Sequence, residues 1–82
     1  MRYTVLIYED AEEKLYGAVV PELPGCVTQG ETLDEALANI REAIEGHLLA
    51  MAAYGEDLPE EMGLPVIATV DVQPDLTAVA ER

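Results

Sequence analysis

The stretch from residue 32 to residue 55 constrains the fold more than any other part of the chain, because it alone is long and periodic enough for a helix of about six turns. Thr32, with Glu35 three residues later, forms a capping box at its start, and Gly55 can close its end in the left-handed conformation. At about 100° per residue, apolar side chains recur along one narrow sector, which we expect to face the core. These side chains are Leu33, Leu37, Ile40, Ile44, Leu48 and Met51.

Strands are expected on both sides of this helix, since a single-domain chain of 82 residues has room for one such helix and a sheet to cover it. Runs rich in β-branched, aromatic and other apolar residues predict three strands before the helix and one after it. Pro21 ends the second, because proline cannot donate to a sheet ladder, and Pro24 with Gly25 suits a type II turn before the third. The predicted strands are residues 2–8, 15–20, 26–29 and 66–72.

The predicted order, β-β-β-α-β, belongs to the α+β class, with one long helix packed on one face of a four-stranded mixed sheet. If the fourth strand runs parallel to its neighbour, the crossover through the helix is right-handed. We expect the domain to comprise residues 1–72 and to leave residues 73–82 as a short tail.

One helix covers only one face of a sheet, so the other face is expected to be open. Alternation along the first strand places Thr4, Leu6 and Tyr8 on one face, opposite Tyr3, Val5 and Ile7. Apolar side chains on an open face form a patch of the kind that marks an interface. We therefore predict that Thr4, Leu6 and Tyr8 contact a partner and that the chain forms a homo-oligomer, either a dimer or a tetramer. His47 and Leu49, on the helix, are the predicted oligomer contacts.

The charge of the chain narrows the choice of partner. Seventeen acidic residues against four basic ones give a formal net charge of −13. Nucleic-acid binding depends on Lys and Arg neutralising phosphates, so direct binding of nucleic acid is not expected. A basic protein would be attracted, and the acidic loop residues Glu9, Asp10, Glu12 and Glu13 are its predicted contacts. The alternative is that the acidity only keeps a small protein soluble.

The sequence offers few residues for catalysis or metal binding. The lone Cys26 excludes an internal disulfide and a zinc site built from several cysteines of one chain. His47 has no second histidine nearby, which favours packing over a role as base or metal ligand, and the acidic loops lack the spacing of a calcium loop. We expect no cofactor and no metal. Without a leader pattern or an apolar run near 18 residues, the sequence indicates a soluble cytoplasmic protein with no membrane contact.

Several motifs, taken together at their spacing, resemble the HicB antitoxin family of bacterial and archaeal toxin-antitoxin systems. They are Tyr-Thr-Val at 3–5, Pro-Glu-Leu-Pro-Gly-Cys at 21–26, Gly-Glu-Thr-Leu-Asp-Glu-Ala at 30–36 and Asn-Ile-Arg-Glu-Ala-Ile at 39–44. The resemblance covers residues 1 to about 72. It implies a partial RNase H-like fold, in which strand four lies alongside strand one.

The resemblance also implies a function. Members of the family typically bind and block HicA, a small basic toxin that cuts mRNA, and many carry a C-terminal DNA-binding module. Residues 73–82 are too few for such a module, so we expect none in this sequence. The leading hypothesis is an antitoxin that covers the active and RNA-binding surface of a HicA-type toxin, without enzymatic activity.

Two alternatives to the antitoxin hypothesis stay open. One is an oligomeric scaffold or small-ligand regulatory domain without a toxin partner. The other is a metal-dependent nuclease, which the sequence disfavours because strand one has no acid between Tyr3 and Tyr8 and Asp71 has no obvious partners.

Overall fold

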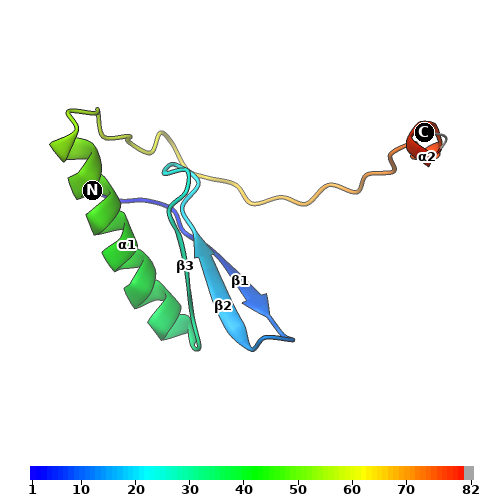
Figure 1. Ribbon diagram of the computed structural model, residues 1–82, viewed down its shortest axis with the longest axis horizontal. Coiled ribbons are helices and arrows are strands. Elements are labelled where there is room, and N and C mark those ends of the chain that lie inside the picture. The colour runs from blue at the N-terminus through cyan, green and yellow to red at the C-terminus, as the bar shows by residue number, and fades with distance from the viewer. Residues whose placement is uncertain (81–82) are drawn as a thin grey trace.

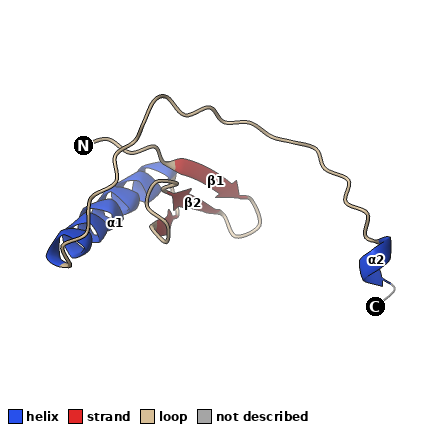
Figure 2. Ribbon diagram, turned by 90° about the horizontal axis from the view of Figure 1, so that it is seen from above, coloured by secondary structure: helices blue, strands red, loops and turns tan. Residues whose placement is uncertain are grey.

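A computed structural model describes residues 1–80 and shows an α+β fold, in which a three-stranded antiparallel sheet is followed by one long helix (Figure 1). The strands lie in the order β1-β2-β3, and α1 packs on one face, in contact with β3 and β2 (Figure 2). The elements are β1 Leu6–Asp10, β2 Leu15–Val19, β3 Val27–Gly30, α1 Leu33–Ala53 and a short α2 Thr77–Ala80. In residues 1–80, no helix is both long enough and apolar enough to cross a membrane.

The predicted caps of the long helix are confirmed. The Thr32 hydroxyl oxygen accepts a hydrogen bond from the Glu35 backbone N–H at 3.0 Å, and the Glu35 carboxylate accepts one from the Glu31 N–H at 3.3 Å. At the other end, Gly55 has φ = 73°, and the Glu56 N–H donates to the Met51 carbonyl at 2.9 Å. Both ends therefore satisfy backbone groups that the helix leaves free.

The core lies between α1 and the sheet. Its buried residues are Ala18, Val20, Leu23, Cys26, Ala36 and Ile40. Tyr3, Val5 and Ile7 pack against this core, which is the face predicted for them. Leu23 is buried because the turn after β2 folds it back, with the Leu23 N–H donating to the Val20 carbonyl.

The predicted stripe of α1 is correct in its C-terminal part and wrong at its start. Ile40 is 2% exposed, whereas Leu33 and Leu37 are 46% and 43% exposed. The buried face is rotated toward Ala36, since β3 approaches the helix so closely that a Cβ built on Gly30 would lie 2.5 Å from the Ala36 nitrogen. Only small side chains fit at that contact.

The prediction of a fourth strand at residues 66–72 is wrong, and with it the four-stranded mixed sheet. These residues form an exposed segment outside any sheet, with Val66 89% exposed and Val70 81% exposed. The period-two pattern predicts strand conformation, but a strand also requires a neighbour with which to pair, and the pattern does not identify one. The radius of gyration is 16.9 Å, against about 12 Å for a compact domain of this length.

The strand ends also differ from the prediction. β1 begins at Leu6 and continues through Glu9 and Asp10, which were expected in the loop. Continued backward, the β1–β2 register places Thr4 opposite Pro21, where β2 has already ended. Residues 2–5 therefore extend beyond the paired part of the sheet.

Candidate partner-binding surfaces

The acidic residues predicted to contact a partner project from the β1–β2 hairpin. Glu9 and Asp10 end β1, and Glu12 and Glu13 lie exposed in the turn that follows. One Asp10 carboxylate oxygen accepts the backbone N–H groups of Glu12 at 3.0 Å and Glu13 at 3.1 Å. Lys14 completes the turn with φ = 53°. The hairpin thus holds its acids in a defined loop geometry, and Asp10 stabilises the turn as well as carrying charge.

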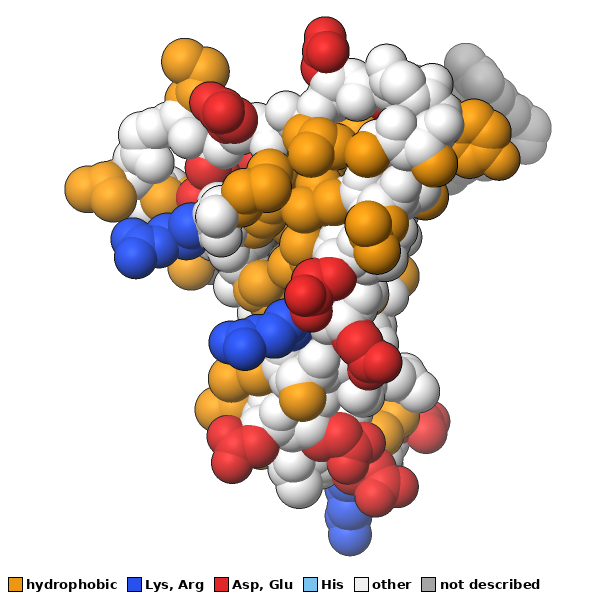
Figure 3. Space-filling view, turned by 90° about the vertical axis from the view of Figure 1, so that its left-hand side faces the viewer, with side chains coloured by type: hydrophobic (Ala, Val, Ile, Leu, Met, Phe, Trp, Pro, Cys, Tyr) orange, Lys and Arg blue, Asp and Glu red, His pale blue; other side chains and the backbone are white. Residues whose placement is uncertain are grey.

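The hairpin acids are joined by a second acidic group at the start of α1, of which the sequence analysis discussed only Glu35, as part of the capping box. The register pairs Glu9 with Tyr16 and Tyr16 with Gly30, so the hairpin end of the sheet is also the end at which α1 begins (Figure 1). Figure 3 shows acidic side chains gathered toward one end of the molecule. We call this surface the acidic end; it comprises Glu9, Asp10, Glu12, Glu13, Glu31, Asp34 and Glu35.

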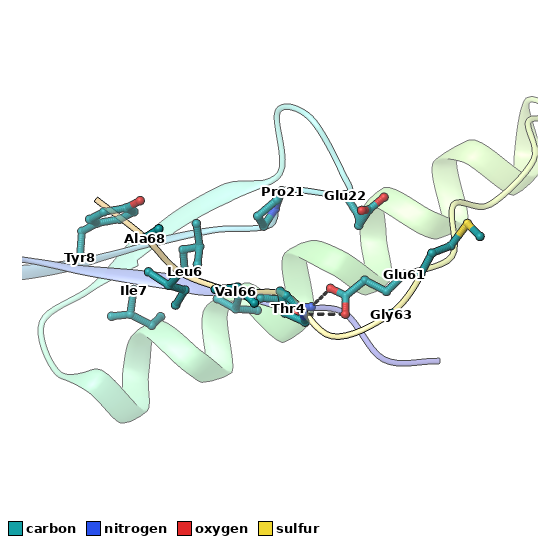
Figure 4. Close-up of a pocket in the computed structure, with 14 residues that line it drawn as sticks. Thr4, Leu6, Ile7, Tyr8, Pro21, Glu22, Glu61, Gly63, Val66 and Ala68 are labelled. Atoms are coloured by element: carbon teal, nitrogen blue, oxygen red, sulfur yellow. Dashed lines mark hydrogen bonds between the residues drawn. The ribbon is translucent and has the colours of Figure 1, made fainter. Parts of the chain in front are cut away.

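Thr4, Leu6 and Tyr8, the predicted apolar contacts, alternate with the core-packed Tyr3, Val5 and Ile7 along β1 and the segment just before it. Tyr8 is 60% exposed. All three residues line a hollow of about 570 Å³ between β1 and the beginning of the exposed C-terminal segment, whose Val66 and Ala68 line its other side (Figure 4). The structure therefore brings these three residues together, beside a segment that was expected to lie within the sheet.

Glu61 is a contact that sequence reasoning missed. Its carboxylate accepts hydrogen bonds from the Thr4 backbone N–H and from the Thr4 hydroxyl, the latter at 3.0 Å (Figure 4). The Tyr3 hydroxyl donates to the Pro59 carbonyl on the same loop. These bonds fix the loop after α1 to the N-terminal segment, beyond the point at which the pairing of β1 with β2 ends. Because the partners are 57 residues apart, no local pattern indicates this contact.

A second hollow, of about 660 Å³, lies on the helix side of the N-terminal segment. Its apolar lining comes from both elements, and we call it the helix-side groove; Tyr3, Val5, Leu37, Ile44 and Leu48 line it. Arg2 and Arg41, two of the four basic residues of the chain, also line it, and so does Glu45. Figure 3 shows the hydrophobic surface with basic side chains beside it.

The predicted oligomer contacts on α1 do not form one surface. Leu49 is 71% exposed, as expected, and His47 is half-buried. Two residues apart on a helix, they point about 200° away from each other. Their role in an oligomer remains a prediction.

Among residues 1–80, no group of three or more His, Cys, Asp or Glu side chains is arranged to hold a metal ion. Cys26 is buried, and this burial raises the pKa of its thiol. A raised pKa lowers the fraction of thiolate, the nucleophilic form, at neutral pH.

The chain matches a family model described as the HicB-like antitoxin of bacterial toxin-antitoxin systems, over residues 3–80. It is 46% identical over 61 residues to UPF0150 protein Ta0767 of Thermoplasma acidophilum, covering 74% of this chain and 87% of the relative. It is 41% identical over 59 residues to UPF0150 protein ssr1765 of Synechocystis, covering 72% and 73%.

Two solved structures share the fold. The crystal structure of the N-terminal domain of the Burkholderia pseudomallei antitoxin HicB superposes with a TM-score of 0.64 at 37% identity, covering 73% of this chain and 69% of that domain. The crystal structure of the Burkholderia pseudomallei antitoxin HicB gives a TM-score of 0.68 at 36% identity, covering 78% of this chain. The chain spans about half of that second structure, 48% of its length.

Proposed function

Because the chain belongs to the HicB-like antitoxin family of bacterial toxin-antitoxin systems, we propose that it binds a small basic mRNA-cleaving toxin of the HicA type and covers its active and RNA-binding surface. The family match over residues 3–80 is the observation that carries this proposal. Inhibition by covering a surface requires only binding, so the chain acts without chemistry of its own. Since the target of such a toxin is mRNA, the complex forms in the cytoplasm.

The charge of the chain supports a cationic partner. An RNA-cleaving protein presents Lys and Arg to phosphates, and a net charge of −13 attracts such a surface over roughly a Debye length, about 8 Å at physiological salt. The acidic end concentrates that charge on a hairpin and a helix start that are held by hydrogen bonds. In this proposal, the acidic end steers association and opposes the cationic RNA-binding surface of the toxin.

Apolar contact comes from the open sheet face in this proposal. Leu6 and Tyr8 lie on β1, Thr4 lies in the segment just before it, and all three line one hollow. An interface generally combines an apolar centre with a charged rim. The acidic hairpin and the open face together supply both parts.

The proposal is tested by expressing the tagged chain in its native host, isolating it at low salt and identifying what co-purifies. The expected result is a basic protein of toxin size that arrests growth when expressed alone and is silenced by co-expression of this chain. Recovery of the chain with no partner down to low salt would contradict the antitoxin role and favour a scaffold without a toxin.

A charge variant tests the electrostatic part. We expect Glu12→Gln with Glu13→Gln to weaken toxin binding at low salt roughly tenfold, equivalent to about 1.4 kcal/mol, and to flatten the dependence of affinity on salt. The matched control removes the same charge from the loop after α1, with Asp57→Asn and Glu60→Gln. Equal losses in the two variants would show that net charge acts without a contact at the acidic end.

A further inference from the structure

The hollow of about 570 Å³ beside β1 has walls from three parts of the chain. β1 and the residues just before it form one wall, and residues 61–68, which we call the wall segment, form the other (Figure 4). Pro21 and Glu22, from the turn after β2, complete the lining. Sites that bind ligands usually enclose about 300–1,000 Å³, so the hollow is large enough to receive part of another molecule.

Hydrogen bonds fix the start of the wall segment in place. The Glu61 carboxylate accepts the backbone N–H and the hydroxyl of Thr4, and the Tyr3 hydroxyl donates to the Pro59 carbonyl, two residues earlier. The wall segment nevertheless belongs to no sheet in the described part of the chain, and its Val66 side chain is exposed. An apolar wall that is held beside β1 and left uncovered is suited to contact with a partner.

The charges of the hollow identify the kind of partner. Among the described residues that line it, only Glu22 and Glu61 are charged, and both are acids. Continued backward, the β1–β2 register brings the turn after β2 beside Thr4, so Glu22 lies at the end of the hollow where Glu61 binds Thr4. Figure 4 shows Tyr8 and Ala68 toward the other end. One end of the hollow therefore attracts a cation, and the rest of its lining is mostly apolar.

The helix-side groove lacks this bias, because Arg2 and Arg41 line it together with Glu45. Of these two hollows, the one beside β1 thus has the lining that suits a cationic partner. Its apolar walls require apolar side chains from the same partner, so a single small cation would leave most of the lining uncovered. An extended segment of protein that carries both Arg or Lys and apolar residues meets both requirements, and the exposed ring of Tyr8 offers a face on which a guanidinium can stack.

We propose that the hollow beside β1 receives an extended basic segment of the partner protein, with its apolar side chains against β1 and the wall segment and an Arg or Lys at the end where Glu22 and Glu61 lie. This inference rests on the proposed function for the nature of the partner, a cationic toxin. It adds the place at which that partner inserts a segment. Because the Glu61 carboxylate already accepts two hydrogen bonds from Thr4, Glu22 is the acid that pairs with the incoming cation.

The three methionines of the chain report which surface is occupied. Met62 lines the hollow beside β1, Met1 lines the helix-side groove, and Met51 packs against the core. The full chain, labelled at its methionine methyl groups for NMR, is titrated at low salt with a synthetic peptide in which leucine and arginine alternate. The expected result is a shift of the Met62 signal, with the signals of Met1 and Met51 unchanged. A peptide in which leucine and glutamate alternate is the control and should shift none of the three.

A matched pair of variants tests the wall segment. Val66→Arg places a positive charge within the hollow, whereas Val70→Arg places the same charge on the same exposed stretch of chain, at a residue that does not line the hollow. Both valines are exposed, so neither change disturbs the core, and circular dichroism checks the helix content. Val66→Arg should weaken binding of the basic peptide and of the toxin roughly tenfold or more, and Val70→Arg should weaken it far less. Equal weakening would show that net charge acts without a contact in the hollow.

The peptide titration requires no toxin, so failure of this inference and failure of the proposed function give different results. If a toxin binds and shifts Met1 in place of Met62, the proposed function stands and the site proposed here is wrong. If no toxin co-purifies and the basic peptide still shifts Met62 alone, the proposed function is wrong and the hollow receives a basic segment of another protein. A Met62 signal that neither the peptide nor a co-purified toxin shifts would overturn the proposal.

Discussion

At the scale of single residues, Gly30 determines how closely the sheet and the helix approach each other. A Cβ at this position would lie 2.5 Å from the Ala36 nitrogen and 2.9 Å from the Ala36 Cα, and both are backbone atoms that cannot move aside alone. Ala36 is fully buried. The reason for glycine here is therefore space, and the first turn of α1 depends on it.

We predict that Gly30→Ala lowers the free energy of unfolding by about 1–3 kcal/mol, the usual range for overpacking, because the start of α1 must shift away from β3. The measurement is urea unfolding followed by circular dichroism. Gly46→Ala is the control, since nothing lies within 4 Å of a Cβ built there, and in a helix interior it should stabilise by about 0.5–1 kcal/mol. Destabilisation of equal size in both variants would contradict the close contact.

A second prediction at the scale of single residues concerns Cys26 and the pH dependence of the unfolding free energy. Because burial raises the pKa of its thiol, the folded chain holds this proton more tightly than the unfolded chain. That contribution to stability is present below the ordinary thiol pKa of about 8.5 and is lost as the pH rises through this value toward the higher folded pKa. The unfolding free energy of the parent should therefore fall more steeply above about pH 8.5 than that of Cys26→Ala.

A chemical measurement checks the same property. At neutral pH a thiol reagent should modify Cys26 much more slowly in the folded chain than in the urea-unfolded chain, since modification requires exposure and the thiolate. Equal rates would show that the thiol is accessible and that its environment does not disfavour the charged form.

At the scale of elements, the buried face of α1 differs from the predicted one. The observed and the predicted faces imply different losses of stability when a side chain of α1 is shortened. Ile40 lies in the core, whereas Leu37 lies at the edge of the helix-side groove. We expect Ile40→Ala to cost about 2–5 kcal/mol, as for other large-to-small core changes, and Leu37→Ala to cost less than about 1 kcal/mol. Thermal unfolding of the two variants at low protein concentration measures the difference. Similar losses of stability in the two variants would instead support the stripe predicted from the sequence, in which Leu37 lies in the core.

Local patterns were sufficient to predict the three early strands, the helix and both of its caps. Each depends on neighbours in sequence: alternation for the strands, Thr32 with Glu35 for the start of α1 and Gly55 for its end. The phase of α1 could not be predicted in the same way, because it depends on the close contact with Gly30, which belongs to another element. The prediction of a strand at residues 66–72 was wrong for the same reason. Alternation indicates strand conformation, but it does not identify the neighbouring strand that pairing requires.

The same distinction applies to the candidate surfaces, some of which follow from local sequence patterns and others from contacts between distant residues. The hairpin acids and the open-face residues of β1 follow from a single strand and its turn. The contribution of Glu31, Asp34 and Glu35 to the acidic end requires the register of β2 with β3, and the contact of Glu61 with Thr4 joins residues 57 positions apart. Such contacts are properties of the folded chain, and one sequence does not contain a local signal for them.

At the scale of the whole molecule, a net charge of −13 acts on folding and on partner binding in opposite directions. Folding brings like charges together, so added salt should stabilise the folded chain by screening their repulsion. Association with a cationic partner brings unlike charges together, so the same salt should weaken it. We therefore predict that one sodium chloride series raises the thermal midpoint of the isolated chain while it lowers the affinity for the toxin.

The stabilisation of the folded chain by salt is measurable, since an increase of about 1 kcal/mol in the free energy of unfolding raises the thermal midpoint of a domain of this length by about 4–8 °C. Calorimetry of the chain and titration of its complex, in the same buffers, give the two slopes. If toxin affinity were unchanged across the series, the acidic end would have no part in recognition, and the apolar face would have to supply the binding alone.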